Sequence, residues 1–197
     1  MAIIAITGEV CSGKSSVAGL LKKKGAVIFD ADRIVHGYYQ DKNSRVYKKV
    51  SRDFPECVSD SGISRKKLGR SVFKDKAGLA RLEKIVHPAV IADLKNWIKE
   101  NRKAKKLFVA EVPLLFEKKL NNLFKQVVLV VSPKQEVVKR ITKKYVISPA
   151  QAVKRLSLFM PLENKIKKAD YLIENNASLK ELKKKTDILF KQIKVNA

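Results

Sequence analysis

The stretch from Gly8 to Ser15 limits the folds open to this chain more than any other part of its sequence. It reads GEVCSGKS, with two glycines followed by lysine and serine. The residues before it, 2–7 (AIIAIT), form an apolar run typical of a buried strand, and residues 16–21 (SVAGLL) have a helical pattern. A strand that leads through a glycine-bearing loop into a helix predicts an α/β fold.

The same stretch fits the pattern G-x-x-x-x-G-K-[ST], which indicates a phosphate-binding loop. Its glycines let backbone N–H groups converge on phosphate oxygens, and the N-terminus of the following helix adds positive potential. Lys14 is expected to bridge the β- and γ-phosphates, and the Ser15 hydroxyl to ligate Mg²⁺. A chance match in a turn is the alternative, and the flanking strand and helix argue against it. The loop predicts a bound nucleoside triphosphate without fixing the reaction.

Four further segments rich in β-branched residues complete a predicted sheet. Their near-continuous hydrophobicity is typical of parallel strands covered on both faces, and helical patterns alternate with them. The expected fold is therefore α/β, with a three-layer core around a parallel five-stranded sheet. The four segments are 26–29 (AVIF), 106–112 (KLFVAEV), 126–131 (QVVLVV) and 171–173 (YLI).

Two helical stretches interrupt this alternation. The 197 residues suffice for one sizeable core with a small appended lobe. Residues from about 41 to 103 show helical patterns and no convincing strand, and in a kinase they would form an inserted acceptor-binding lobe. Residues from about 133 to 168 are helical and basic, and would form a lid. The core then consists of residues 1–40, 104–132 and 169–197.

Sequence signals also predict where several helices begin. Ser132 and Ser148 are each expected at an N-cap, because proline occupies the next position and glutamine follows three residues after the serine. Ser178 is a third candidate cap. His87-Pro88 is expected to begin another helix, since proline fits the first helical position.

Charge and cysteine content narrow the possible partners. The net charge of +24 would suit a nucleic-acid-binding protein, but the lysines are spread along the chain without a recognition motif. We therefore expect no nucleic-acid partner and interpret the charge as solvated helix faces and phosphate steering. No apolar run approaches the ~20 residues of a membrane span, and no secretory signal is evident, so no membrane partner is expected. Two cysteines, Cys11 and Cys57, form no disulfide framework, which favours the cytoplasm.

Chain length and missing motifs separate the classes of nucleotide-binding protein. A GTPase would need a guanine-reading Asn/Thr-Lys-x-Asp segment, and the nearest text, residues 164–167 (NKIK), lacks the aspartate. A motor would need more chain. A small-molecule kinase fits, and it requires a carboxylate beside the acceptor hydroxyl. A nucleoside or nucleotide kinase and, supported only by charge, a nucleotide-dependent nucleic-acid-binding protein are the alternatives.

Asp30 and Asp32 follow the second predicted strand directly. Ligands of open α/β sheets bind at the carboxyl ends of strands, and strand 26–29 is expected to flank strand 2–7, so Asp32 should face the phosphate loop. There it would orient the acceptor hydroxyl and accept its proton. Either aspartate could instead cap the next helix, an interpretation that we prefer for Asp30.

Several other charged residues have both a functional and a structural interpretation. Glu111 closes a predicted strand and could hold Mg²⁺ through water. Glu117 could serve the site or lie in the first turn of a helix. Arg140 and Arg155 in the lid stretch could neutralise the transferring phosphate, whereas Lys143-Lys144 are better explained as an exposed helix face.

In their order along the chain, these segments resemble the dephospho-CoA kinase family over nearly the whole sequence. The phosphate loop alone is generic, whereas 30–32 (DAD), His87-Pro88 and 113–117 (PLLFE) in this order are quite specific. The other shared positions are His36, Arg140, Arg155, 160–163 (MPLE), 169–171 (ADY) and Asn175-Asn176.

The resemblance implies phosphorylation of the ribose 3′-hydroxyl of dephospho-CoA, a small-molecule substrate, by ATP and Mg²⁺ in a cytoplasmic monomer. It implies that Asp32 is the catalytic base, with Lys14 and Arg140 as further catalytic residues. The positions implied to contact ATP are Gly8, Cys11, Ser12, Gly13, Lys14, Ser15, Ser16, Arg140 and Asn175. Those implied to contact the acceptor are Asp32, His36, His87 and Glu117.

The chain also departs from the family pattern at several positions. Glu9 and Cys11 stand where glycine is usual, and Glu111 where aspartate is common. Lys144 replaces a lid arginine, and Phe159 replaces glutamine. A carboxylate at position 9 should weaken the binding of ATP phosphates unless it points away from them.

Overall fold

The computed structural model describes residues 3–72, 75–176 and 178–195, and the chain divides into two compact units. The first unit runs up to Phe29 and resumes at Ile98, and the second runs from Asp30 to Trp97. Residues 30–40, which the sequence analysis counted with the core, fall in the second unit, and residues 98–103, which it counted with the lobe, fall in the first. Ala2, at the start of the first predicted strand, lies outside the described residues.

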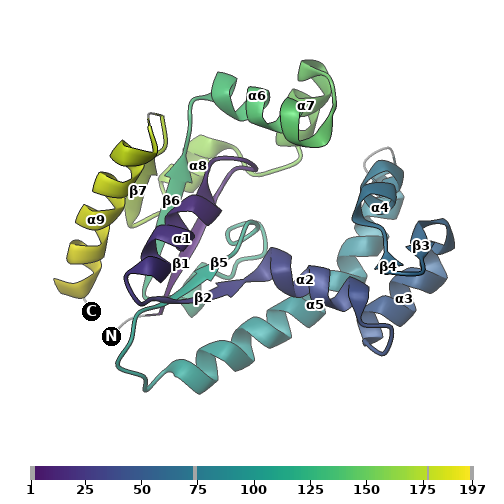
Figure 1. The fold of residues 1–197 in the computed structure, drawn as a ribbon, viewed down its shortest axis with the longest axis horizontal. Coiled ribbons are helices and arrows are strands. Elements are labelled where there is room, and N and C mark those ends of the chain that lie inside the picture. Colours follow the sequence, from purple (N-terminus) through teal and green to yellow (C-terminus); the bar gives the residue numbers. More distant parts are fainter. Residues whose placement is uncertain (1–2, 73–74, 177, 196–197) are drawn as a thin grey trace. The chain divides into compact units, whose positions relative to one another are not determined.

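The first unit is built on a five-stranded sheet with the strand order β2-β5-β1-β6-β7 (Figure 1). The pairs β1–β5, β1–β6 and β6–β7 are parallel. Each of the five predicted strands is confirmed to within two residues at either end. Their bounds are β1 Ile3–Gly8, β2 Val27–Asp30, β5 Phe108–Glu111, β6 Gln126–Val131 and β7 Tyr171–Glu174.

The prediction that residues 26–29 flank residues 2–7 was wrong. Strand β5 lies between β2 and β1, and the N–H of Val27 donates to the carbonyl oxygen of Leu107 over 2.9 Å. Burial explains the order, because every residue of β5 is buried whereas Val27 on β2 is 36% exposed, as suits an edge strand. The adjacency argument for placing Asp32 near the loop therefore no longer holds.

One face of the sheet is covered by helices α1 (Lys14–Lys23) and α9 (Leu179–Val195), which lie side by side (Figure 1). Ile4 and Ile6 of β1 point into this layer, and both are fully buried with Val17 and Leu21 of α1. Each such side chain contributes about 1.5–3 kcal/mol by leaving water. Because this core lies directly under the start of α1, it fixes the loop between β1 and α1.

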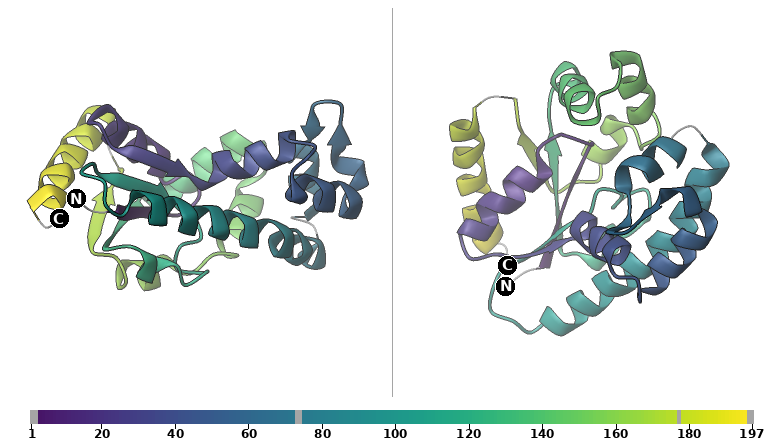
Figure 2. Two further views of the ribbon diagram at one scale, coloured as in Figure 1. Left: turned by 90° about the horizontal axis from the view of Figure 1, so that it is seen from below. Right: turned by 45° about the vertical axis from the view of Figure 1, so that its right-hand side comes forward.

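Helices α6 (Lys134–Tyr145), α7 (Pro149–Leu156) and α8 (Leu162–Ile166) lie between β6 and β7 along the chain. Helices α6 and α7 pair as a hairpin (Figures 1 and 2). The predicted cap at Ser148 is confirmed as a full capping box with Gln151, and Ser178 caps α9 by accepting from the N–H of Glu181 over 3.3 Å.

The second unit is mainly helical, as predicted, but it also contains a short hairpin that the sequence analysis missed. Strands β3 (Val58–Ser59) and β4 (Gly62–Ile63) are antiparallel and only two residues long each, too short for a periodic pattern to reveal them. The unit has its own apolar core, centred on fully buried Val50 and Cys57. The other elements are α2 Ala31–Gln40, α3 Arg45–Asp53, η1 Pro55–Cys57, α4 Arg65–Val72 and α5 Lys76–Asn101.

The prediction that His87-Pro88 begins a helix was wrong, because Pro88 lies inside α5. A proline there removes one backbone donor and crowds the carbonyl of the residue four positions earlier, at a cost of about 3 kcal/mol. The helix continues because apolar side chains are buried on both sides of the proline, with Val86 6% and Leu94 1% exposed. Burial of these side chains therefore outweighs the helix-breaking effect of the proline.

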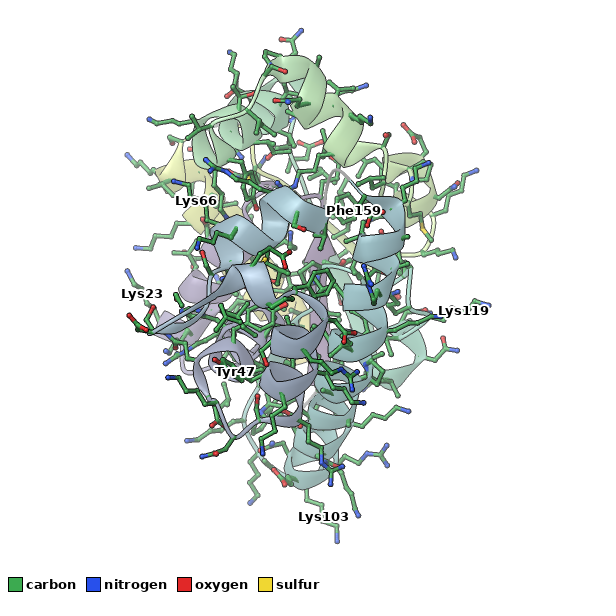
Figure 3. All side chains as sticks on the ribbon, turned by 90° about the vertical axis from the view of Figure 1, so that its right-hand side faces the viewer. Lys23, Tyr47, Lys66, Lys103, Lys119 and Phe159 are labelled. Carbon is green, nitrogen blue, oxygen red and sulfur yellow. The ribbon has the colours of Figure 1, made fainter. Side chains whose placement is uncertain are left out.

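Most of the lysines that give the chain its charge are solvent-exposed. The labelled side chains of Lys23, Lys103 and Lys119 extend outward from the ribbon (Figure 3). Among the described residues, only Lys14 and Lys165 are buried lysines. In the part of the chain that the structure describes, no helix combines the length and apolarity needed to cross a membrane.

Candidate active site

The loop between β1 and α1 has a backbone that only certain residues allow. Gly8 has φ +151° and Gly13 φ +103°, both in the region that favours glycine. A Cβ on Gly8 would collide with the carbonyl oxygen of Val130, and one on Gly13 with the side-chain amide of Asn175. Cys11 has φ 61° despite its side chain. The two glycines of the pattern are therefore required by conformation and by close neighbours.

Lys14 is held along the loop rather than extended into solvent. Its ammonium donates to the carbonyl oxygens of Gly8 over 3.2 Å and Glu9 over 2.8 Å, and the residue is only 7% exposed. Ser12 closes the turn by donating its N–H to the carbonyl of Glu9 over 3.1 Å. The loop thus presents a lysine charge beside the N-terminus of α1, which is an arrangement that attracts phosphate.

Ser15 and Glu111 meet at the start of α1. The Ser15 hydroxyl donates to Glu111 Oε1 over 2.7 Å, and Glu111 is 6% exposed. A hydroxyl and a carboxylate are the hard oxygen donors that Mg²⁺ prefers, so these residues fit the ion. No group of three or more His, Cys, Asp or Glu that could hold a metal occurs among the described residues.

A second layer of polar contacts braces the loop from β6 and β7. The Ser132 hydroxyl lies 3.0 Å from the carbonyl oxygen of Ser12 and 2.7 Å from that of Asn175, and it can donate to one of them at a time. The Asn175 side-chain amide donates to the same Ser12 carbonyl over 2.9 Å. Arg140 donates to the carbonyl oxygen of Cys11 over 3.2 Å and to Ser132 Oγ over 3.1 Å. The side chains of Arg140 and Asn175 therefore hold the loop by hydrogen bonds to its backbone carbonyl oxygens.

The predicted N-cap role of Ser132 was wrong for this reason. Helix α6 begins at Lys134 with Pro133 as its N-cap, and no side chain makes the cap hydrogen bond. The Ser132 hydroxyl is instead committed to the loop. Nothing in the local sequence could have revealed this, because its partners lie far away along the chain.

Apolar contacts also join the α6–α7 hairpin to the loop. Val10 and Cys11 pack against a small core formed by Val137, Ile141 and Ala152, each of which is fully buried. This packing explains why the loop tolerates an apolar residue and a cysteine at these positions.

The candidate residue Arg155 is partly buried, whereas two lysines of the same helical stretch are exposed. The Arg155 guanidinium lies 3.8 Å from the ring centroid of Tyr145, and burial lowers the pKa of its side chain. Lys143 and Lys144 are exposed, as their structural interpretation predicted.

Glu117 and Lys165 form an ion pair that the sequence analysis did not foresee. The Lys165 ammonium lies 2.8 Å from Glu117 Oε1, and Lys165 is fully buried. The alternative prediction of Glu117 in the first turn of a helix was wrong, because residues 113–119 form successive turns. A lone lysine in a basic chain gives no sequence signal of burial.

In the second unit, Asp30 and Asp32 take different roles. Asp30 caps helix α2 by accepting from the N–H of Arg33 over 3.0 Å, as we predicted. Asp32 lies in the first turn of α2 with an exposed side chain, and His36 is exposed one turn further on. On α5, His87 Nδ1 lies 3.8 Å from Glu83 Oε2.

Comparisons with known proteins agree on one family. A sequence profile described as dephospho-CoA kinase matches residues 2–181. The dephospho-CoA kinase of Aquifex aeolicus is 34% identical over 192 residues, covering 96% of both chains, and that of Carboxydothermus hydrogenoformans is 36% identical over 180 residues, covering 90% of this chain and 87% of the relative. The solved structure of the dephospho-CoA kinase from Campylobacter jejuni superposes with a TM-score of 0.72 at 28% identity, covering 99% of this chain and 98% of that one.

Proposed function

The chain belongs to the dephospho-CoA kinase family, and we propose that it transfers the γ-phosphate of ATP to the ribose 3′-hydroxyl of dephospho-CoA, the last step of coenzyme A synthesis. The observation that carries this proposal is the family match over residues 2–181, supported by a loop in which both glycines have positive φ and Lys14 and Ser15 lie in the first turn of α1.

The nucleotide side of the reaction is assigned to the first unit. We propose that Lys14 moves from the carbonyl oxygens of Gly8 and Glu9 to the β- and γ-phosphates, because a phosphate oxygen carries more negative charge than a carbonyl. The loop amides, Ser16 and the N-terminus of α1 would hold the remaining phosphate oxygens. Arg140, already at the edge of the loop, would neutralise charge on the transferring group.

Mg²⁺ is proposed to bind at the Ser15 hydroxyl, with Glu111 holding it through water. When bound, the ion would neutralise charge on the phosphates. The observation that supports this proposal is the 2.7 Å hydrogen bond between Ser15 Oγ and Glu111 Oε1, because it places the two oxygen ligands side by side.

The acceptor side is assigned largely to the helical second unit. We propose that Asp32 orients the acceptor hydroxyl and accepts its proton. Because Asp30 makes the helix cap, the Asp32 carboxylate is not needed for that structural task. His36 and His87, with Glu117 of the first unit, are proposed to contact the acceptor, and the α6–α7 hairpin to act as the lid.

The setting proposed for the enzyme is a cytoplasmic monomer that has no nucleic-acid or membrane partner. Both Cys11 and Cys57 are free thiols, which suits a reducing compartment.

The experiment that tests the proposed function is an acceptor panel in a coupled assay of ATP consumption. Dephospho-CoA should support turnover, whereas adenosine, AMP, shikimate and gluconate should support little. Faster turnover with a nucleoside or nucleotide would assign a different acceptor. A filter-binding titration with salt would reveal any nucleic-acid binding, because many phosphate contacts give a steep dependence on salt.

A further inference from the structure

Lys165 occupies an unusual place for a lysine. It lies in helix α8 and is the largest fully buried side chain of the described residues. Its ammonium is 2.8 Å from Glu117 Oε1, and it lies 6.0 Å from the centroid of the Phe159 ring. Burying an ammonium costs several kcal/mol unless it is paired, and even a paired one often adds nothing to stability compared with apolar side chains. We therefore look for its role in the position of the groups that it contacts.

Glu117 holds two points of the same segment. Besides pairing with Lys165, its Oε1 atom accepts a hydrogen bond from the backbone N–H of Met160 over 3.1 Å. Met160 precedes α8 and Lys165 lies near its end. One carboxylate thus fixes the chain between residues 160 and 165, directly after the α6–α7 hairpin.

This segment is also linked to the phosphate loop. The hairpin before it packs on Val10 and Cys11, and Arg140 of the hairpin donates to the Cys11 carbonyl. Burial raises the pKa of Glu9, and among the opposing effects the charge of Lys165 is the largest. Lys165 therefore supplies positive charge to the loop position where the family usually has glycine.

We infer that Lys165 and Glu117 are positioning residues that together fix the chain behind the lid hairpin, that the positive charge of Lys165 also acts against the negative charge of Glu9, and that both effects raise the affinity of the phosphate loop for ATP. This inference rests on the proposed binding of ATP at that loop. Neither residue is required to touch the transferring phosphate.

The test is calorimetric titration of ATP into the full chain and into its Lys165→Met variant. We expect the variant to bind ATP at least about tenfold more weakly, because an unpaired Glu117 and an uncompensated Glu9 both disturb the loop. The KM for ATP should rise more than kcat falls. Lys167→Met is the matched control, because Lys167 is exposed on the same segment, and it should bind ATP like the unaltered chain.

A second variant separates the charge effect from simple damage to the fold. Adding Glu9→Gln to Lys165→Met should raise ATP affinity by a larger factor than Glu9→Gln does in the otherwise unaltered chain, whereas a purely structural role of Lys165 predicts equal factors. If Lys165→Met fails to fold, the double variant Glu117→Gln, Lys165→Met removes both charges together and should fold. Its ATP affinity should then remain below that of Lys167→Met.

The outcomes distinguish the inference from the function on which it rests. Unaltered chain and Lys167→Met that both fail to bind ATP would refute the proposed function. Normal ATP binding by the unaltered chain, together with equal binding by Lys165→Met, would refute the inference alone.

Discussion

The phosphate loop and the surface of helix α2 hold their candidate residues in opposite ways. In the loop, Lys14 and Ser15 are tied to neighbouring oxygens, and the backbone is braced by Ser132 and Asn175 from two other strands. On α2, Asp32 and His36 are exposed, and the helix is positioned by its cap and by the apolar core below it.

The difference agrees with the roles proposed for the two regions. A loop that gathers several phosphates needs its dipoles fixed in advance, since reorganising them during binding would cost affinity. An acceptor base needs an accessible carboxylate that can meet a hydroxyl. We therefore expect mutations to separate the two regions: changes on α2 should affect turnover with little effect on stability, whereas changes around the loop should affect both.

The largest effect is expected for Asp32→Asn. Loss of the proposed proton acceptor should lower kcat by about 10²- to 10⁴-fold, with ATP affinity and the unfolding midpoint unchanged, since the side chain is exposed. Steady-state kinetics with dephospho-CoA and a parallel ATP titration measure this. Turnover close to that of the unaltered chain would remove Asp32 from the mechanism.

Ser132→Ala should show the coupling expected around the loop. The hydroxyl lies among the Ser12 and Asn175 carbonyls and the Arg140 guanidinium, and its loss removes all three contacts at a buried point of the brace. We expect a loss of about 1–3 kcal/mol in the free energy of unfolding, measured by urea denaturation, together with weaker ATP binding. Ser157→Ala, which removes an exposed hydroxyl, serves as the control. Equal free energies of unfolding for the two variants would show that the contacts of the Ser132 hydroxyl do not stabilise the fold.

Asp30→Ala tests whether Asp30, and not Asp32, stabilises the start of helix α2. Removing the cap should cost about 1 kcal/mol of unfolding free energy, whereas Asp32→Ala should cost much less because Asp30 makes the cap hydrogen bond. Urea denaturation of both variants gives the comparison. The reverse order would mean that Asp32 stabilises the helix start and that its exposure is not a sign of function.

The smallest effect concerns Glu9 and depends on pH. Burial raises the pKa of this carboxyl, so the folded state disfavours its charged form. Below the usual pKa of 4.5 the side chain is protonated whether folded or unfolded, and Glu9→Gln should change stability little. Once the pH has risen past the raised pKa, the cost of burying the charged Glu9 carboxylate opposes folding in full. The Glu9→Gln variant should then be more stable than the unaltered chain. Denaturation at a series of pH values measures this trend, and a constant difference would contradict it.

The sequence predicted the local features of this molecule and missed those that depend on distant contacts. The loop between Gly8 and Ser15 and the five strands follow from short-range patterns and were found. The place of β2 at the sheet edge was missed, because strand order depends on which segment is buried more completely. Pro88 inside α5 was misjudged, because packing outweighed a local stop signal.

The same limit applies to the candidate site. Lys14, Ser15 and Glu111 could be named from the loop pattern and a strand end, and two of them meet directly. Ser132 and Lys165 could not, because a serine before a proline usually caps a helix and a lysine is usually exposed. The roles of Asp32 and His36 came from family resemblance together with one position at a strand end.

The central claim is that the loop around Lys14 binds the triphosphate of ATP, and the most direct test compares ATP and AMP in calorimetric titrations of the unaltered chain and of Lys14→Met. The account predicts that the unaltered chain binds ATP at least about tenfold more tightly than AMP, since charge-assisted contacts to the outer phosphates are lost with AMP. It predicts that Lys14→Met, with its fold intact, loses most of this preference. Equal affinity for ATP and AMP in the unaltered chain, or an undiminished preference in Lys14→Met, would contradict it.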